Sequence, residues 1–175
     1  MNIKIANKYI GEGQKTFFIA EAGVNHNGKI SLAYKLVDMA VRAGADAIKF
    51  QTFKAKNIST VHAPKSNYHI KTTGSDKKQT WYQLLKSQEL NYEQHKKIIK
   101  YCNKKKIIFL STPYDEESVD LLADLGVKIL KIASTDANNH PLLNYICKKN
   151  IPVILSTAMC NIKEVTESVN LLKAN

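Results

Sequence analysis

The 175-residue sequence lacks the features that would mark a membrane, secreted or zinc-finger protein. It contains no run of about 18 apolar residues, the length that a helix needs to cross a bilayer. Its first residues lack the basic and then apolar order of a signal peptide. Cys102, Cys147 and Cys160 are odd in number and show neither a close pair nor Cys/His ligand spacing. We therefore expect a cytoplasmic protein with reduced thiols.

Negative charge is scarce, because 26 Lys and Arg residues face 15 Asp and Glu residues and give a formal net charge of +11. Nucleic-acid binding is one interpretation of this excess. The lysines are scattered over presumed helix faces, however, with short runs such as residues 104–106, and no nucleic-acid motif accompanies them. A basic surface equally attracts a phosphorylated, carboxylated substrate. We expect neither a nucleic acid nor a membrane as partner.

What the sequence does contain is a repeated alternation of strand and helix patterns. Stretches rich in Ile, Val, Leu and Phe recur, each followed by a segment of helical period, which is typical of an α/β fold around a parallel sheet. The predicted strands are residues 16–21, 46–52, 107–112, 127–133 and 152–157, after a small hairpin within residues 1–13. Residues 53–79 show no clean period and are interpreted as a long loop after the second strand.

Helix signals follow the predicted strands. The first predicted helix, residues 31–43, has an apolar stripe formed by Leu32, Leu36, Met39, Ala40 and Ala43. Another is expected at residues 92–104. Asp115 is placed to cap a third helix that ends at Gly126. Asn161 and Glu164 have the spacing of a capping box for a later helix.

Polar residues occur near the end of each predicted strand on one face. Because side chains alternate along a strand, the residues on that face are apolar first and polar last, whereas a fully buried parallel strand is apolar throughout. The polar set is Glu21, Lys49, Gln51, Thr112, Lys131 and Ser156. The carboxyl ends of parallel strands meet at one edge, so we expect an anion-binding site there. A structural ion pair between Lys49 and Glu21 is the alternative, but one carboxylate does not balance two lysines.

Five segments in order resemble blocks of the NeuB family of sialic-acid-synthase-type enzymes. They are FIAEAGVNHNG at residues 18–28, KFQTFKA at 49–55, FLSTPYD at 109–115, KIAS at 131–134 and ILSTAM at 154–159. The resemblance implies a partial (β/α)8 TIM barrel of about five βα units, because a whole barrel usually needs about 250 residues. We expect residues 1–175 to be an incomplete barrel domain without its later units, its metal-binding histidines or an antifreeze-like domain. The full-length family member is expected to be a homodimer.

The resemblance also implies an activity and roles for individual residues. The family condenses phosphoenolpyruvate with an N-acetylated amino sugar aldehyde, with a divalent Mn or Mg ion polarising the aldehyde. Glu21, Lys49 and Lys131 are the expected catalytic residues, and Glu21 orients or deprotonates the attacking water. The residues expected to bind phosphoenolpyruvate are Lys49, Thr112, Lys131, Ser134 and Ser156. Gln51 and Asp136 are expected to hold the sugar, and no metal ligand is expected within this segment.

Two departures from the family pattern concern the sugar. Asp136 stands where the family often has a glutamate, in Ser134-Thr135-Asp136, and Ala158 replaces a glycine. The shorter carboxylate leaves N-acetylmannosamine and a diacetamido relative, on the route to legionaminic or pseudaminic acid, as alternative acceptors. Tyr68 and Trp81 lie in or beside the long loop, where they either cover the site or simply pack.

Other functions remain open at this level. Lys49 or Lys131 would form a Schiff base in a class I aldolase. A catalytically incomplete binding or assembly fragment is the second alternative, and the isolated chain is expected to show little turnover. His26, between Asn25 and Asn27, is interpreted as shaping a loop, with metal ligation as its alternative.

Overall fold

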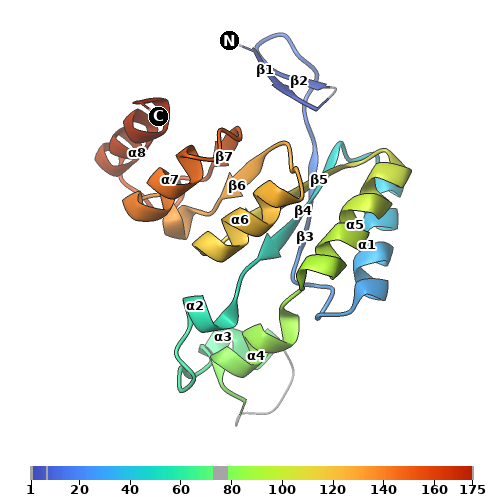
Figure 1. The fold of residues 1–175 in the computed structure, drawn as a ribbon, viewed down its shortest axis with the longest axis vertical. Coiled ribbons are helices and arrows are strands. Elements are labelled where there is room, and N and C mark those ends of the chain that lie inside the picture. The colour runs from blue at the N-terminus through green and yellow to red at the C-terminus, as the bar shows by residue number, and fades with distance from the viewer. Residues whose placement is uncertain (1, 7, 73–78, 175) are drawn as a thin grey trace.

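The computed structural model describes residues 2–6, 8–72 and 79–174. Positions 1, 7, 73–78 and 175 lie outside the described residues, including part of the predicted hairpin and of the predicted loop. The described chain forms an antiparallel hairpin and a five-stranded parallel sheet with the strand order β3-β4-β5-β6-β7 (Figure 1). The predicted α/β class, with five strand–helix units after a hairpin, is therefore confirmed.

The strands and helices have the following bounds. The hairpin consists of β1 (Asn2–Ile5) and β2 (Lys8–Gly11), and the sheet consists of β3 (Ile19–Gly23), β4 (Ala47–Thr52), β5 (Ile108–Pro113), β6 (Leu130–Ile132) and β7 (Val153–Leu155). The helices that follow the five sheet strands are α1 (Ile30–Arg42), α5 (Tyr92–Lys105), α6 (Glu116–Asp124), α7 (His140–Cys147) and α8 (Ile162–Ala174). The last two strands are shorter than predicted, and β3 begins later than predicted.

The predicted caps of α6 and α8 are confirmed. The Asp115 side chain accepts the backbone N–H of Ser118 at 2.9 Å. Asn161 and Glu164 exchange the two hydrogen bonds of a capping box, at 2.8 and 3.1 Å. These caps set where each helix begins after its strand, and so hold the loops at the carboxyl edge of the sheet.

The apolar stripe predicted for α1 is partly confirmed, because Ala40 is buried and Leu36 packs against the core, whereas Met39 and Ala43 are exposed. The buried residues of the helix are Ala33, Val37 and Ala40, while Met39 is 55% exposed. Two of the three buried residues are alanines, and the larger Met39 faces away from the core. Hydrophobicity alone does not reveal this preference for small residues.

The segment between β4 and α5 is also more ordered than predicted. It contains the short helices α2 (Ala55–Ile58) and α3 (Asn67–Thr72), followed by α4 (Trp81–Gln88), and these three lie together beyond one end of the sheet (Figure 1). Thr80 and Gln83 form a capping box that starts α4. The interpretation of residues 53–79 as a loop is therefore corrected for the parts that form α2 and α3.

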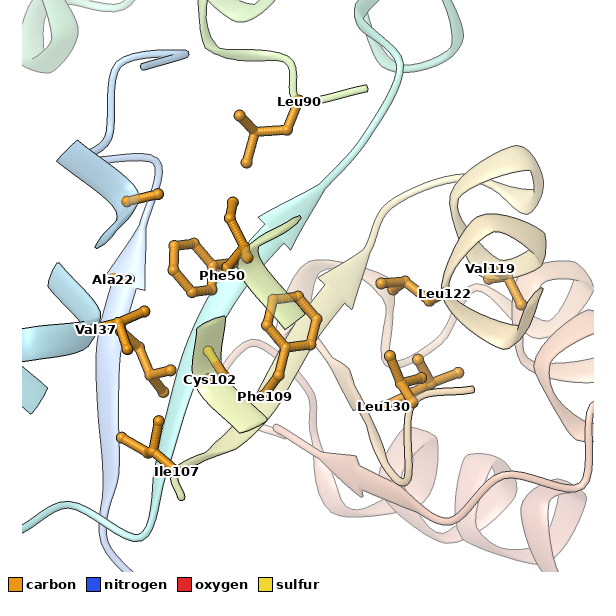
Figure 2. Packing of buried hydrophobic residues seen from close by; sticks show 14 of the residues in the cluster. Ala22, Val37, Phe50, Leu90, Cys102, Ile107, Phe109, Val119, Leu122 and Leu130 are labelled. Carbon is orange, nitrogen blue, oxygen red and sulfur yellow. The ribbon is translucent and has the colours of Figure 1, made fainter. Parts of the chain in front are cut away.

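The main core lies between the helices and the outer face of the sheet. Phe50 of β4 and Phe109 of β5 stack there with ring centroids 5.6 Å apart, and Figure 2 shows these rings among side chains of the helices. Among the described residues, no helix is both long and apolar enough to cross a membrane.

Neighbouring helices around the sheet are joined by a repeated polar arrangement. On α1 and α5, the Tyr101 hydroxyl donates to the carboxylate of Asp38 at 3.0 Å, and Lys105 pairs with the same carboxylate at 2.6 Å. The Lys105 ammonium also lies 5.2 Å from the centroid of the Tyr101 ring. The equivalent trio is Asp120 of α6, Tyr145 of α7 and Lys149 in the turn that follows α7.

A chain of buried polar groups lies behind the carboxyl ends of β4 and β5. His95 of α5 donates through Nδ1 to the carbonyl of Asn91 at 3.0 Å, so its Nε2 accepts from the Thr52 hydroxyl at 2.9 Å. The Thr52 oxygen then accepts from the hydroxyl of Ser111 at 2.7 Å. His95, Thr52 and Ser111 are at most 2% exposed. This network fixes the strand ends that carry the predicted site.

His26 is a second buried histidine near this network, in the loop between β3 and α1. Its side chain is 0% exposed. Burial lowers its pKa from 6.5 to about 4, and the neighbouring His95 contributes in the same direction. Burial is also the largest cause of the lowered pKa of His95. Both rings are therefore neutral in the folded protein at pH 7.

We predict that acid destabilises this fold through His26. Between pH 6.5 and 4 the unfolded chain binds a proton that the folded chain does not bind, so the free energy of unfolding falls as the pH falls. The shift corresponds to a loss of about 3 kcal/mol from His26 when pH 4 is reached. Urea unfolding at a series of pH values measures this loss, and the His26→Asn variant should lose correspondingly less. Equal acid sensitivity of the two proteins would contradict the assignment.

Candidate active site at the carboxyl edge of the sheet

The inner face of the sheet, opposite the helices, is apolar in its first half. Its buried members Ala47, Leu110 and Ile129 pack with Ile5 of the hairpin. The partly buried residues that complete this cluster are Ile10, Phe17, Ile19, Ile108 and Ile154. By strand alternation, seven members of this cluster share the face of the polar set, so the predicted alternation is confirmed: Phe17, Ile19, Ala47, Ile108, Leu110, Ile129 and Ile154. Two positions after the last apolar residue of each strand on this face, a polar residue follows: Glu21, Lys49, Thr112, Lys131 and Ser156.

Glu21 and Lys49 form the first part of the candidate site. They are register partners on β3 and β4, and Lys49 Nζ lies 2.5 Å from Glu21 Oε2. The Lys49 side chain is 14% exposed, whereas that of Glu21 is 53% exposed. The ion pair predicted as the alternative therefore exists, with its carboxylate open to solvent and its ammonium largely enclosed.

Gly23 lies beside both the Glu21 carboxylate and the Gln51 amide. The strand pairing shifts between Glu21 and Gly23, and Gly23 has a φ of +53°. A Cβ atom at this position would lie 3.3 Å from Glu21 Oε1 and 3.9 Å from Gln51 Nε2. A side chain here would therefore be strained by the positive φ and would press against the Glu21 carboxylate. Gln51 in turn pairs in register with Thr112 of β5, which is 2% exposed.

Lys131 and Ser156 form the second part of the site. The Lys131 ammonium donates to the Ser156 hydroxyl and, at 2.9 Å, to the carbonyl of Ile132. Burial lowers the pKa of Lys131, the positive charge of Lys49 lowers it further, and Glu21 acts in the opposite direction. The two lysines thus influence each other electrostatically from one side of the sheet. An anion bound between them would relieve this repulsion.

The turn after β6 brings further predicted residues to the same edge. Ser134 and Asp136 are the first and last residues of a 3-10 turn. The Asp136 carboxylate accepts hydrogen bonds from Asn139 at 3.2 Å and from Thr135 at 3.3 Å. Asp136 is half-buried, and its carboxylate can accept further hydrogen bonds beyond these two.

Tyr114 is a residue at this edge that the sequence interpretation missed. Burial raises the pKa of its hydroxyl, and the carboxylates of Asp136 and Glu21 raise it further. Tyr114 thus lies within electrostatic reach of both carboxylates. Its position directly after β5 was the available signal, because residues at that place face the mouth of the site.

A cavity of about 1110 Å³ opens beside the first part of the site. Glu21, Lys49 and Gln51 line it at the sheet. Tyr68 and Trp81 also line it, as the sequence led us to consider, and so does Tyr114. The sequence interpretation did not assign the polar lining residues Asn25, Asn27, Ser87 and Gln88. Of the predicted site residues, Thr112, Lys131, Ser134, Asp136 and Ser156 are not part of this lining.

The described residues do not fit the divalent metal that the family resemblance implies. In residues 2–6, 8–72 and 79–174, no group of three or more His, Cys, Asp or Glu side chains could hold a metal ion. The Glu21 carboxylate is engaged by Lys49. His26 is buried without metal-ligand neighbours of this kind, so we assign it no metal.

The chain is similar in sequence to proteins named as legionaminic and pseudaminic acid synthases. The chain is 49% identical over 162 residues to an N,N'-diacetyllegionaminic acid synthase of Campylobacter jejuni, a match that covers 93% of this chain and 48% of the relative. A pseudaminic acid synthase of the same species is 33% identical, with 91% of this chain and 46% of the relative covered.

A solved structure is similar over almost the whole chain. The N-acetylneuraminic acid synthetase of Leptospira borgpetersenii, in complex with citrate, matches with a TM-score of 0.84 and 32% identity, covering 99% of this chain and 55% of that one. The present chain therefore spans about half the length of the proteins it matches. Its residues 36–175 match the NeuB family, and since this is most of the sequence, the chain belongs to the NeuB family.

Proposed function

We propose that this chain takes part in condensing phosphoenolpyruvate with an N-acetylated amino sugar aldehyde to give a nonulosonic acid and phosphate, as a carbon–carbon bond forming transferase of EC class 2.5.1. In this reaction C3 of phosphoenolpyruvate bonds to the aldehyde carbon, whose oxygen takes up a proton. Water adds at C2, the bond to the phosphate oxygen breaks, and a ketone remains. The named activities of the relatives, which are legionaminic, pseudaminic and N-acetylneuraminic acid synthases, support this proposal.

The observation that carries the proposal is that two lysines on one face of the sheet have a single carboxylate, Glu21, as an ion-pair partner. Lys49 has one carboxylate partner, Glu21, and Lys131 has a hydroxyl and a carbonyl as its hydrogen-bond partners. Partly buried cations without balancing carboxylates are costly unless an anion accompanies them. Phosphoenolpyruvate carries a phosphate and a carboxylate, and therefore suits two lysines that lie on one face.

The proposal assigns the remaining site residues by their chemistry. The hydroxyls of Thr112, Ser134 and Ser156 would donate to the phosphate and carboxylate oxygens. Glu21, more exposed than its lysine partner, would orient the water that adds at C2 or take up its proton.

The cavity next to Glu21 and Lys49 is the proposed place for the acceptor sugar. Gln51 lines it, and its amide would hydrogen-bond to the sugar. Asp136 would contact the sugar from the neighbouring turn, through Tyr114 or directly. We propose a diacetamido sugar ahead of N-acetylmannosamine, because the relative at 49% identity is named as an N,N'-diacetyllegionaminic acid synthase.

Several features belong to the whole protein and are part of the proposal. The remaining barrel units, the antifreeze-like domain and the ligands of a divalent Mn or Mg ion would come from outside residues 1–175. The whole protein would be a cytoplasmic homodimer. The span of about half the length of the relatives supports this division.

A class I aldolase is the second candidate, favoured by one observation. A lysine that forms a Schiff base must lose its proton to act as a nucleophile. The lowered pKa of Lys131, caused first by burial and then by Lys49, would assist this loss. The same shift also follows from an unfilled anion site, so a chemical test must separate the two functions.

We predict that Lys49→Met and Lys131→Met each weaken phosphoenolpyruvate binding by the chain about 10- to 100-fold, the cost of losing one charge-assisted hydrogen bond. Isothermal titration calorimetry measures this effect. Lys96→Met, on the exposed surface of α5, is the matched control and should bind like the unsubstituted chain. Equal affinities for all four proteins would rule out the proposed anion site.

Borohydride reduction in the presence of pyruvate separates the synthase from the aldolase. We expect no covalent adduct on either lysine, because the synthase reaction passes through no Schiff base. Peptide mass spectrometry after reduction provides the measurement. A pyruvyl adduct on Lys49 or Lys131 would establish the aldolase instead.

A turnover assay tests the division between this chain and the rest of the protein. The isolated chain with manganese, phosphoenolpyruvate and either a diacetamido sugar or N-acetylmannosamine should release little or no phosphate. A whole family member assayed in parallel with its own acceptor should release phosphate only when both substrates are present. Rapid phosphate release by the isolated chain would show that residues 1–175 suffice.

A further inference from the structure

The loop between β3 and α1 presents two asparagines to the cavity and one histidine to the interior. Asn25 and Asn27 are exposed and line the cavity, whereas His26 between them is 0% exposed. The imidazole ring lies against Phe50 of β4, with ring centroids 6.0 Å apart. One buried side chain is therefore flanked on both sides by amides that face the cavity.

His26 makes one specific hydrogen bond inside this loop. Its Nδ1 accepts the backbone N–H of Gly28 at 3.0 Å, so the neutral ring carries its hydrogen on Nε2. That Nε2 is buried and has no hydrogen-bond partner in the described part of the chain. A buried donor without an acceptor costs free energy, so stability does not explain an imidazole here. We explain the imidazole instead by its Nδ1 atom, which accepts the N–H of Gly28 and so fixes the shape of the loop.

Gly28 connects the loop to a second wall of the cavity. It has a φ of +71°, and a Cβ atom on it would lie only 2.3 Å from the backbone oxygen of Ser87. Ser87 and Gln88, at the end of α4, line the same cavity. The hydrogen bond from Gly28 to His26 therefore holds the point where the loop and α4 meet.

We propose that His26 is a positioning residue that holds the amides of Asn25 and Asn27, and with them the Ser87–Gln88 wall, in place to bind the acetamido group of an amino sugar. Primary amides both donate and accept hydrogen bonds, as an acetamido group does, which makes this rim complementary to such a sugar. His26 itself is enclosed and touches no ligand. The choice of ligand rests on the proposed function, whereas the positioning role rests on the hydrogen bond to Gly28.

Two substitutions of His26 separate its acceptor from its bulk. His26→Asn retains an acceptor for the N–H two residues later, because an asparagine side chain forms this contact in an Asx-turn. His26→Leu fills the space but offers no acceptor. His140→Leu is the matched control, since His140 also has a buried Nε2 without a partner among the described residues and lies on α7, outside the cavity lining.

The ligand measurement is calorimetry with N-acetylmannosamine in the presence of phosphoenolpyruvate, and with phosphoenolpyruvate alone. We expect His26→Leu to weaken sugar binding about 10-fold, the effect of one hydrogen bond, with phosphoenolpyruvate affinity unchanged. His26→Asn and His140→Leu should bind both ligands like the unsubstituted chain. An equal loss of affinity for both ligands in His26→Leu would indicate general misfolding and overturn the proposal.

Amide hydrogen exchange tests the positioning role without any ligand. In His26→Leu, exchange should become faster at residues 25–28 and at residues 87–88, and His26→Asn should restore the slow exchange. Unchanged exchange in His26→Leu would refute the positioning role even if the sugar binds. Absence of N-acetylmannosamine binding by the unsubstituted chain would instead contradict the proposed acetamido contact at this rim, and the exchange result would still decide the role of His26.

Discussion

Two lysines that share one face of a parallel sheet with a single carboxylate are the constraint on which the site depends. Strand alternation places Lys49 and Lys131 on the same face as an apolar cluster, on its carboxyl-edge side. Ile5 and Ile10 of the hairpin are part of that cluster. Burial and mutual repulsion both disfavour two ammonium groups in this position, as the lowered pKa of Lys131 shows. Folding tolerates this cost because Glu21 offsets part of it and because the strand ends remain accessible. A bound anion would offset the remainder.

The surroundings of the site are built so that these strand ends do not move independently. The hydrogen bonds from Ser111 to Thr52 and from Thr52 to His95 join β4, β5 and α5 behind the site. On the other side, the contact of Gly28 with Ser87 joins the loop after β3 to α4. The two lysines and the cavity thus belong to one connected structure. A neutral buried histidine lies at each of the two connections, His95 at the first and His26 at the second.

Much of this arrangement could be predicted from the sequence, since it follows from local rules. The period-2 alternation identified the inner face, including Ala47, Leu110 and Ile129, and the caps at Asp115 and Asn161 followed from residue type and spacing. The roles assigned to the polar set remain predictions.

The remaining features depended on contacts between distant segments. The buried face of α1 includes Ala33 and Val37, which the predicted stripe left out, while the predicted Met39 is exposed. The cavity residues Ser87 and Gln88 are far in sequence from Asn25 and Asn27, and no periodic pattern indicates that they meet. The missed helix α4 did carry a local signal, the capping box of Thr80 and Gln83.

The most direct test of the central claim is a crystal structure of this chain with phosphoenolpyruvate. We predict that the phosphate and carboxylate lie between Lys49 and Lys131 at the carboxyl edge of the sheet, each lysine donating to an oxygen of the ligand. A structure with the ligand elsewhere, or with the two ammonium groups on opposite faces of the sheet, would contradict the claim.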